Sequence, residues 1–141
     1  MIAYFETSAL VKAIIEEQGS DVATRLWNSA DVVLTSRLTY PEARAALAAA
    51  RRAGRLSDRT HAAAKTELKR RLEASRVIEL AEETAFGAGD FAESHRLRGS
   101  DAVHLASATA PRAPELVFTT WDVELLHAAE AAGLSTAGGS S

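Results

Sequence analysis

The stretch that decides the fold is residues 1–10, MIAYFETSAL, in which an apolar run stops at an acid and two hydroxyl residues follow. Residues 1–5 have the length and the aliphatic and aromatic content of a short buried strand. The next segment, TSALVKAIIEE, has the periodicity of an amphipathic helix, and Thr7 or Ser8 is suited to cap its N-terminus. The carboxylate of Glu6 therefore lies where a buried strand gives way to a helix.

The same alternation of apolar runs and helical segments continues along the chain. Further strands are expected in the segments DVVLTS, VIEL and LVFTT, with helical segments between them. Such an alternation predicts a three-layer α/β/α sandwich with a mainly parallel central sheet of four or five strands. Residues 1–134 are expected to form this single domain. Residues 135–141 are expected to be a flexible Gly/Ser-rich tail, the start of which can add a short strand.

The composition excludes several classes of protein. A length of 141 residues fits one domain, and the content of 47% hydrophobic and 25% charged residues is close to the average of soluble globular proteins. The absence of cysteine excludes disulfides and thiolate metal sites. No apolar run approaches the roughly 18 residues that span a bilayer, and no signal peptide is recognisable. A cytoplasmic location without membrane association is therefore expected.

Charge is distributed unevenly along the chain. Residues 37–76 contain eleven basic and four acidic residues, a net charge of +7, whereas the rest of the chain carries −10. This asymmetry is typical of a protein whose basic part meets a polyanion, although two well-solvated amphipathic helices would produce it too. If the partner is RNA, the residues expected to contact its phosphates are Arg51, Arg52, Arg55, Lys69, Arg70 and Arg71.

Four acids lie at the starts of helices, and each has a simple structural explanation. Glu6 places negative charge near a helix N-terminus. Glu42 follows Thr39 by three residues, so that the sequence TYPE fits a capping box with Thr39 as the N-cap. Asp101 is suited to the cap or the first turn of its helix, and Asp122 is suited to be an N-cap.

The same four acids, taken together, indicate a site. Glu6 and Asp122 end two buried strands, while Glu42 and Asp101 lie in the first turns of helices. In a parallel sheet such positions meet at the carboxyl edge, where ligands bind at the topological switch point. Clustered carboxylates repel one another unless protonation or a cation relieves the repulsion. An oxygen-only set of ligands favours a hard cation such as Mg²⁺ or Mn²⁺.

Four motifs carry a resemblance to a known family. They are MIAYFETSALVK at residues 1–12, LTSRLTYPEARAAL at 34–47, LRGSDAVHLASA at 97–108 and FTTWDVELLHAAEAAGL at 118–134. Together they resemble the PIN-domain ribonucleases, specifically the VapC toxins of bacterial toxin–antitoxin pairs, over nearly the whole chain and in the same order. The resemblance implies a metal-dependent endoribonuclease that hydrolyses RNA, is held by a cognate VapB-type antitoxin and forms a homodimer.

The resemblance also implies the residues of the site. Its catalytic group comprises Glu6, Glu42, Asp101, Asp122 and Thr120, with Glu6, Asp101 and Asp122 as ligands of Mg²⁺ or Mn²⁺. The first acid of the family is normally Asp, whereas this chain has the longer Glu6. Because Mg²⁺ demands near-ideal octahedral geometry, the alternative to an active enzyme is a catalytically impaired RNA- or protein-binding module of the same fold.

The histidines and tryptophans are interpreted mainly as structural residues. His104 follows Asp101 by three residues on nearly the same helix face, so it either reaches the site or is packed with one nitrogen satisfied. His61 is expected to be solvated on its helix. Trp27 and Trp121 are expected to pack, although both could stack on bases. A receiver-type or phosphatase domain is disfavoured because the chain lacks the Asp-x-Asp pair that such a site requires.

Overall fold

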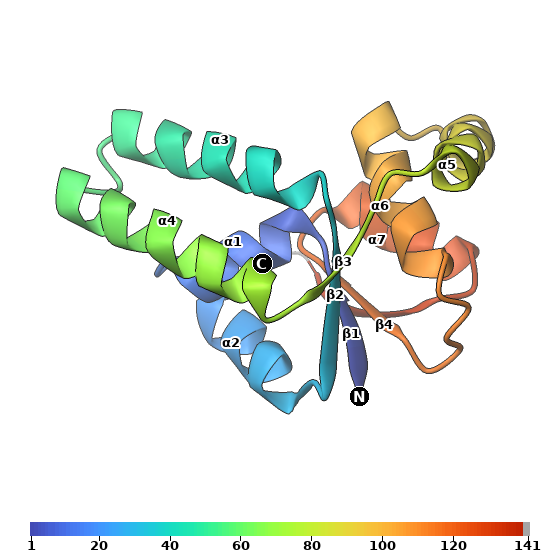
Figure 1. Cartoon of the computed structure of the whole chain (residues 1–141), viewed down its shortest axis with the longest axis horizontal. Helices are drawn as coiled ribbons and strands as arrows, with labels where there is room; N and C mark the ends of the chain where they lie inside the picture. The colour runs from blue at the N-terminus through green and yellow to red at the C-terminus, as the bar shows by residue number, and fades with distance from the viewer. Residues whose placement is uncertain (140–141) are drawn as a thin grey trace.

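The computed structural model describes residues 1–139, in which strands and helices alternate (Figure 1). The strands are β1 (Ile2–Phe5), β2 (Val32–Ser36), β3 (Arg76–Ile78), β4 (Val117–Thr120) and β5 (Ser135–Gly138). The helices are α1 (Thr7–Ile14), α2 (Ser20–Ser29), α3 (Thr39–Arg52), α4 (Asp58–Glu73), α5 (Glu82–His95), α6 (Gly99–Thr109) and α7 (Val123–Ala131).

The five strands of the described residues form one sheet in the order β3-β2-β1-β4-β5, and all of them are parallel. The chain first moves outward from β1 to β3, then crosses to the other side of β1 and continues to β5. The strand order therefore reverses between β1 and β4. In open parallel sheets this switch point is where ligands bind, beyond the carboxyl ends of the strands.

Helices cover both faces of the sheet, as the predicted three-layer sandwich requires. Helices α1 to α4 lie on one side, and α5, α6 and α7 lie on the other (Figure 1). Successive residues of β1 point to opposite faces: Phe5 packs with Leu10 under the first group, and Tyr4 packs with Leu105 under the second. A strand buried on both faces is apolar throughout rather than alternating, which explains the run AYF.

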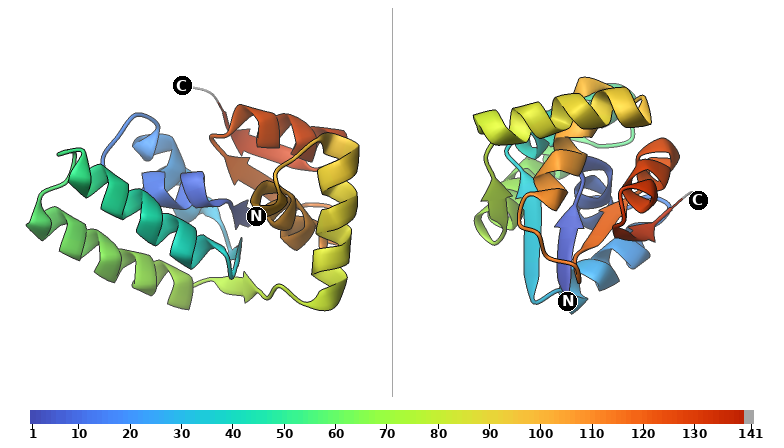
Figure 2. Two further views of the ribbon diagram at one scale, coloured as in Figure 1. Left: turned by 90° about the horizontal axis from the view of Figure 1, so that it is seen from above. Right: turned by 90° about the vertical axis from the view of Figure 1, so that its right-hand side faces the viewer.

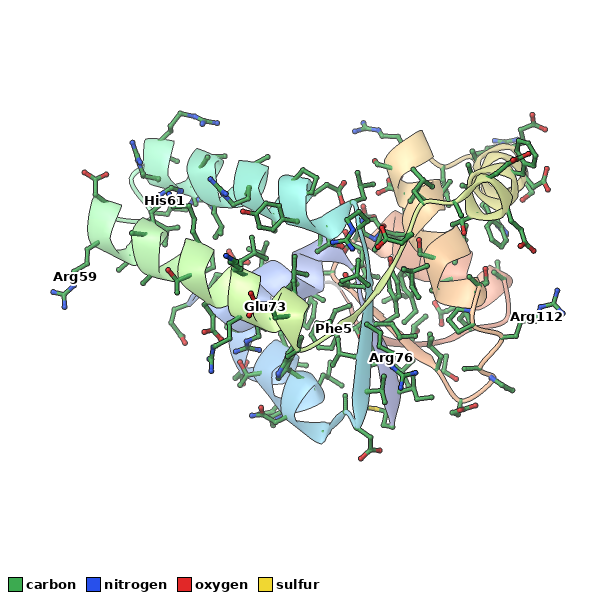
Figure 3. The ribbon with its side chains drawn as sticks, viewed as in Figure 1. Phe5, Arg59, His61, Glu73, Arg76 and Arg112 are labelled. Carbon is green, nitrogen blue, oxygen red and sulfur yellow. The ribbon has the colours of Figure 1, made fainter. Side chains whose placement is uncertain are left out.

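Helices α3 and α4 form a long antiparallel pair, here called the basic arm, that extends away from the sheet (Figures 1 and 2). The turn between them follows from local sequence: Gly54 has a φ of +80°, a conformation that glycine adopts without strain. Ser57 then caps α4 in a capping box with Thr60. In Figure 3, Arg59 lies near the far end of the arm and Phe5 lies beside the sheet.

The C-terminal segment extends the domain beyond the predicted boundary at residue 134. Residues 135–138, at the start of the predicted flexible tail, form the short strand that the sequence allowed there: β5 pairs with β4 from Val117↔Ser135 to Thr120↔Gly138. Gly138 has a φ of +101°, and a Cβ atom there would lie 2.2 Å from the carbonyl oxygen of Thr120. The domain therefore continues to the end of β5. The mobility predicted for the Gly/Ser end falls in part on residues 140 and 141, which lie outside the described residues.

Two further observations concern burial and length. His61 is only 7% exposed, so the prediction of a solvated histidine was wrong: the ring faces the α3 side of α4 (Figure 3). Among the helices of residues 1–139, none combines the length and the apolar character needed to cross a membrane.

Candidate active site at the carboxyl edge of the sheet

Glu6 lies directly after β1 and caps α1 with its own side chain. Its Oε2 atom accepts a hydrogen bond from the backbone N–H of Ser8 at 3.0 Å, and the Ser8 hydroxyl donates to the same oxygen. The N-cap of α1 is therefore Glu6. The prediction that Thr7 or Ser8 caps this helix was wrong. A third donor, the hydroxyl of the fully buried Thr120, contacts Oε2 at 2.8 Å. The longer acid thus bends back onto its own helix and holds one oxygen there.

The end of β4 brings a second acid to the same edge. Thr120 uses its hydroxyl twice, because its oxygen also accepts from the backbone N–H of Asp122 at 3.0 Å. Asp122 is the N-cap of α7, where its Oδ1 accepts from the N–H of Leu125 at 3.1 Å. The predicted capping role of Asp122 is confirmed. One hydroxyl therefore links the acids that follow the two central strands.

Glu42 reaches the edge from α3, and the predicted capping box TYPE does not form. Thr39 is the first residue of the helix, not its cap, and its hydroxyl lies 2.8 Å from that of Thr35 in β2. Glu42 is consequently free to turn toward the site. Its Oε1 accepts a 2.6 Å hydrogen bond from Thr7 and lies 2.6 Å from Nε2 of His104. Burial acts to raise the pKa of Glu42, but the bonds to His104 and Thr7 outweigh it and lower that pKa.

Asp101 completes the group from the first turn of α6. Burial raises its pKa, and the nearby negative charges of Asp122 and Glu6, and more weakly Glu42, raise it further. This repulsion means that the four predicted acids share one electrostatic environment. We call Glu6, Glu42, Asp101 and Asp122 the acidic edge.

The carboxylates of the acidic edge are suitable ligands for a hard divalent cation, but they are not spaced as a complete metal site. Carboxylate oxygens are the ligands that Mg²⁺ and Mn²⁺ prefer. Within residues 1–139, however, no three Asp, Glu or His side chains are close enough together to hold a metal ion by themselves. Mg²⁺ usually binds through one or two carboxylates and completes its shell with water and substrate phosphate. Such a mode fits this edge, since Asp101 carries charge that a cation would neutralise.

A groove of about 520 Å³ opens beside two of these acids, Glu6 and Glu42. Glu6 and Glu42 line it together with Lys12, Arg55 and Trp121. Lys12 lies 5.7 Å from the centre of the Trp121 ring and donates to the carbonyl of Gln18 at 2.8 Å. Glu17 also lines the groove and pairs with Lys12 at 3.2 Å, so its wall combines carboxylates, cations and an aromatic ring. Sequence reasoning did not identify Lys12, because a single lysine on an amphipathic helix has no distinguishing signal.

Comparison with known proteins shows the family of this chain. Residues 3–131 match the PIN domain family. The chain belongs to the PIN domain family. Over 136 residues it is 46% identical to "Ribonuclease VapC45" and to "Ribonuclease VapC49", from two strains of Mycobacterium tuberculosis. These alignments cover 96% of this chain and 94% of each relative.

Solved structures share the fold at lower identity. PAE2754 from Pyrobaculum aerophilum superposes with a TM-score of 0.70 at 24% identity, covering 96% of this chain and 82% of that one. VapC20 of Mycobacterium tuberculosis, titled a sarcin–ricin loop cleaving toxin, gives 0.68 at 22%, covering 95% and 96%. The FitAB complex bound to a DNA fragment gives 0.69 at 18%, covering 97% and 94%. The PIN-like α/β fold predicted from the sequence is confirmed.

In this PIN domain, the predicted RNA-binding residues do not all face the groove. Of the six, Arg55 lines it. Arg51 pairs with Asp58 at 3.3 Å on the basic arm. Arg52 and Lys69 are exposed on the arm. These four remain accessible for phosphate contacts.

Arg70 and Arg71 share a carboxylate, and Arg71 serves the packing of the PIN domain. Both contact Glu67, at 2.7 Å and 2.6 Å respectively. The Arg71 side chain is 16% exposed, and its guanidinium lies 4.6 Å from the centre of the Trp27 ring. Trp27 in turn packs edge-on against Phe5 at 5.4 Å, which places Trp27 in the core as predicted. Arg70 remains exposed.

Proposed function

We propose that this PIN domain is a metal-dependent endoribonuclease and the toxin of a toxin–antitoxin pair. The observation that supports the proposal is the position of Glu6 and Asp122, which follow β1 and β4 at the switch point of a parallel sheet and contact the same Thr120 hydroxyl. The 46% identity to proteins named ribonucleases supports the same activity. It also favours an active enzyme over the impaired binding module.

In this proposal the cation would bind through one or two of the carboxylates of Asp101, Asp122 and Glu6, with water and substrate phosphate as its other ligands. When bound, Mg²⁺ or Mn²⁺ would stabilise charge on the scissile phosphate and lower the pKa of water. Thr120 fixes the position of Glu6 relative to the start of α7, because its hydroxyl contacts Glu6 and the backbone N–H of Asp122. Glu42, whose lowered pKa keeps it ionised, orients water or the cation at the groove.

RNA contacts must come from outside the acids, since a negative edge repels phosphates. Arg55 and Lys12 are the cations that line the groove. The exposed residues of the basic arm would extend this surface along the RNA; they are Arg51, Arg52, Lys69 and Arg70. Loss of two such contacts should weaken binding and flatten its salt dependence.

The partners follow from the family. We infer a VapB-type antitoxin that covers the groove, a homodimer of this chain and a cytoplasmic location. Among the proteins of similar fold are a toxin–antitoxin complex from Klebsiella pneumoniae and a VapBC2 complex from Rickettsia felis. At 18% and 15% sequence identity these structures support only the shared fold. The antitoxin of this chain would be identified by co-purification.

The first test is cleavage of a cellular RNA pool with Mg²⁺ or Mn²⁺, comparing the native chain with Asp122→Asn and Glu6→Asp. Asn caps helices about as well as Asp, so Asp122→Asn removes charge while the start of α7 is kept. Asp21→Asn, at an exposed acid in the first turn of α2, is the matched control.

Cleavage that requires metal and disappears only in Asp122→Asn would support the proposed function. Cleavage by Glu6→Asp alone would replace it with the impaired module. If no variant cleaves any RNA and Mn²⁺ leaves the melting temperature of the native chain unchanged, the metal site is refuted, because a ligand that binds the folded state must stabilise it.

A further inference from the structure

A buried chain of three side chains ends at Glu42. Tyr4 and His104 are both fully buried, and the Tyr4 hydroxyl lies 2.8 Å from Nδ1 of His104. Across the ring, Nε2 of His104 lies 2.6 Å from Oε1 of Glu42 and 3.2 Å from the hydroxyl of Thr7. The Tyr4–His104–Glu42 chain therefore runs from the middle of β1 to the wall of the groove.

The partners of His104 fix which of its nitrogens carries a proton. An ionised carboxylate only accepts hydrogen bonds, so Nε2 must donate to Glu42. Thr7 gives its single hydroxyl proton to the same carboxylate oxygen at 2.6 Å, which leaves the Thr7 oxygen as a second acceptor for Nε2. The other nitrogen, Nδ1, faces Tyr4. The orientation and protonation of the ring thus follow from its two ends.

The Tyr4–His104–Glu42 chain is not explained by core packing alone. Tyr4 already packs in the core by stacking on Phe118, with ring centres 5.2 Å apart and planes 7° from parallel. A buried imidazole costs desolvation that an apolar side chain at the same position would avoid. His104 adds a hydrogen-bond donor, Nε2, that is held in place against Oε1 of Glu42.

The geometry at Glu42 leaves one oxygen for the groove. Within residues 1–139, the hydrogen bonds that Glu42 accepts from side chains both end on Oε1. Its side chain is 30% exposed and lines the groove. Fixing Oε1 restricts rotation of the carboxylate, so that Oε2 is presented in one orientation.

We propose that His104, held by Tyr4, is a positioning residue that orients Glu42 toward the groove. The proposal rests on the proposed ribonuclease function and deepens it, because it adds two buried residues that set the direction of one of its acids. Residues that hydrogen-bond to the ligands of a metal site typically change metal affinity or activity by about 10–100-fold when removed. We expect an effect of this size at His104.

Two amide variants separate the two sides of the ring. His104→Gln places its amide nitrogen near the position of Nε2 and can still donate to Glu42. His104→Asn keeps a polar group only near the position of Nδ1 and can still contact Tyr4. Both variants lose the ring, so both disturb the core. Leu105→Val, at the next residue of α6 in the adjoining core, is the control for lost packing with the hydrogen bonds intact.

The activity readout is kcat and KM on an RNA that the native chain cleaves, at a temperature where calorimetry finds every variant folded. We expect His104→Asn to lower kcat by about 10–100-fold with little change in KM. His104→Gln should recover most of kcat, and Leu105→Val should lose melting temperature but retain kcat. Equal kcat in the Asn, Gln and native proteins would overturn the positioning role.

A second readout does not depend on activity. In ¹⁵N-labelled native protein, Nε2 of His104 should resonate as a protonated nitrogen with a slowly exchanging proton, and Glu42→Ala should shift that signal. An Nε2 that resonates as an unprotonated nitrogen would overturn the proposal. If the native chain cleaves no RNA, the proposed function fails, whereas the imidazole spectrum still decides whether His104 holds Glu42.

Discussion

The acidic edge and the basic arm hold their charges in opposite ways. At the edge, Glu6 accepts three hydrogen bonds on one oxygen, and Glu42 is held by Thr7 and His104. On the arm, Arg51 pairs with Asp58 at 3.3 Å while the two side chains are 52% and 92% exposed. Exposed pairs of this kind contribute about 0–1 kcal/mol.

The difference fits the separate roles that the proposed function gives to the two regions. Groups that act on a reacting atom benefit from being fixed before the substrate arrives. Groups that follow a flexible phosphate backbone benefit from being free to adjust, and weak pairs such as Arg51 and Asp58 are readily exchanged for phosphate. Substitutions in the two regions can show whether the edge is rigid and functional and the arm adaptable, and the largest effect is expected at the edge.

The strongest expected effect is at Asp101. Asp101→Asn should reduce RNA cleavage by more than the roughly 100-fold upper range of outer-shell changes, because it removes a proposed cation ligand. The same variant should melt at a higher temperature than the native chain at pH 7, since it removes a charge that Asp122 and Glu6 repel. Calorimetry and the cleavage assay measure the two effects, with Asp21→Asn as control.

The sign of the Asp101 effect can be checked by pH. Its pKa is raised in the folded protein, so the folded state binds the proton more tightly than the unfolded chain does. Its contribution to stability is therefore fully present below the usual carboxyl pKa of about 3.9 and is lost as pH rises through the raised value. A lower melting temperature of Asp101→Asn at pH 7 would contradict this account.

A smaller effect is expected at Thr120. Thr120→Val keeps the shape but removes the hydroxyl that contacts Glu6 and Asp122. Unpaired buried groups cost about 1–3 kcal/mol, and kcat should fall by about 10–100-fold. Thr120→Ser, which retains the hydroxyl, should stay close to the native chain. If Val and Ser behave alike, the hydroxyl does not organise the edge.

A finer distinction separates Arg55 from Arg71. Arg55→Gln should weaken RNA binding about severalfold and reduce the slope of log K against log salt by about 0.7 for a single-stranded RNA. Arg71→Met should leave that slope unchanged but lower the melting temperature, because Arg71 contacts Glu67 and the Trp27 ring. Binding is measured in the Asp122→Asn background to avoid cleavage. A salt slope altered by Arg71→Met would mean that this side chain leaves its packing site.

The smallest effect is spectroscopic and concerns His61. Burial lowers its pKa, and the positive charges of Lys65, Arg51 and Arg44 lower it further. Stability is therefore lost as pH falls from about 6.5 toward the lowered pKa, because the unfolded chain takes up the proton first. RNA phosphates on the arm should raise the pKa of His61 in an NMR titration. An unchanged titration with bound RNA would place the RNA elsewhere; the ring of His95, on α5, is the control.

Much of the fold could be predicted because strand and helix patterns alternate clearly. What could not be predicted depends on tertiary contacts. Thr39 has the sequence of an N-cap, but its hydroxyl turns to Thr35 in the preceding strand. The Gly/Ser content of residues 135–138 indicates flexibility, yet the open edge of β4 pairs with them.

The four acids of the acidic edge could be proposed from the sequence because each follows a strand or begins a helix. The contact of Tyr4 with His104 could not be predicted, because an aromatic residue in a buried strand normally indicates only core packing. Counting basic residues likewise cannot tell Arg71, which packs on Trp27, from Arg55, which lines the groove. Such distinctions depend on which side of a helix meets its neighbours.

The close approach of Gly138 to Thr120 restricts which residue can occupy position 138. A backbone without a Cβ lets β5 lie against the carbonyl of Thr120, where the N–H of Gly139 also donates at 2.9 Å. Any side chain at position 138 would meet this carbonyl, so β5 can pass the end of β4 only with a glycine there.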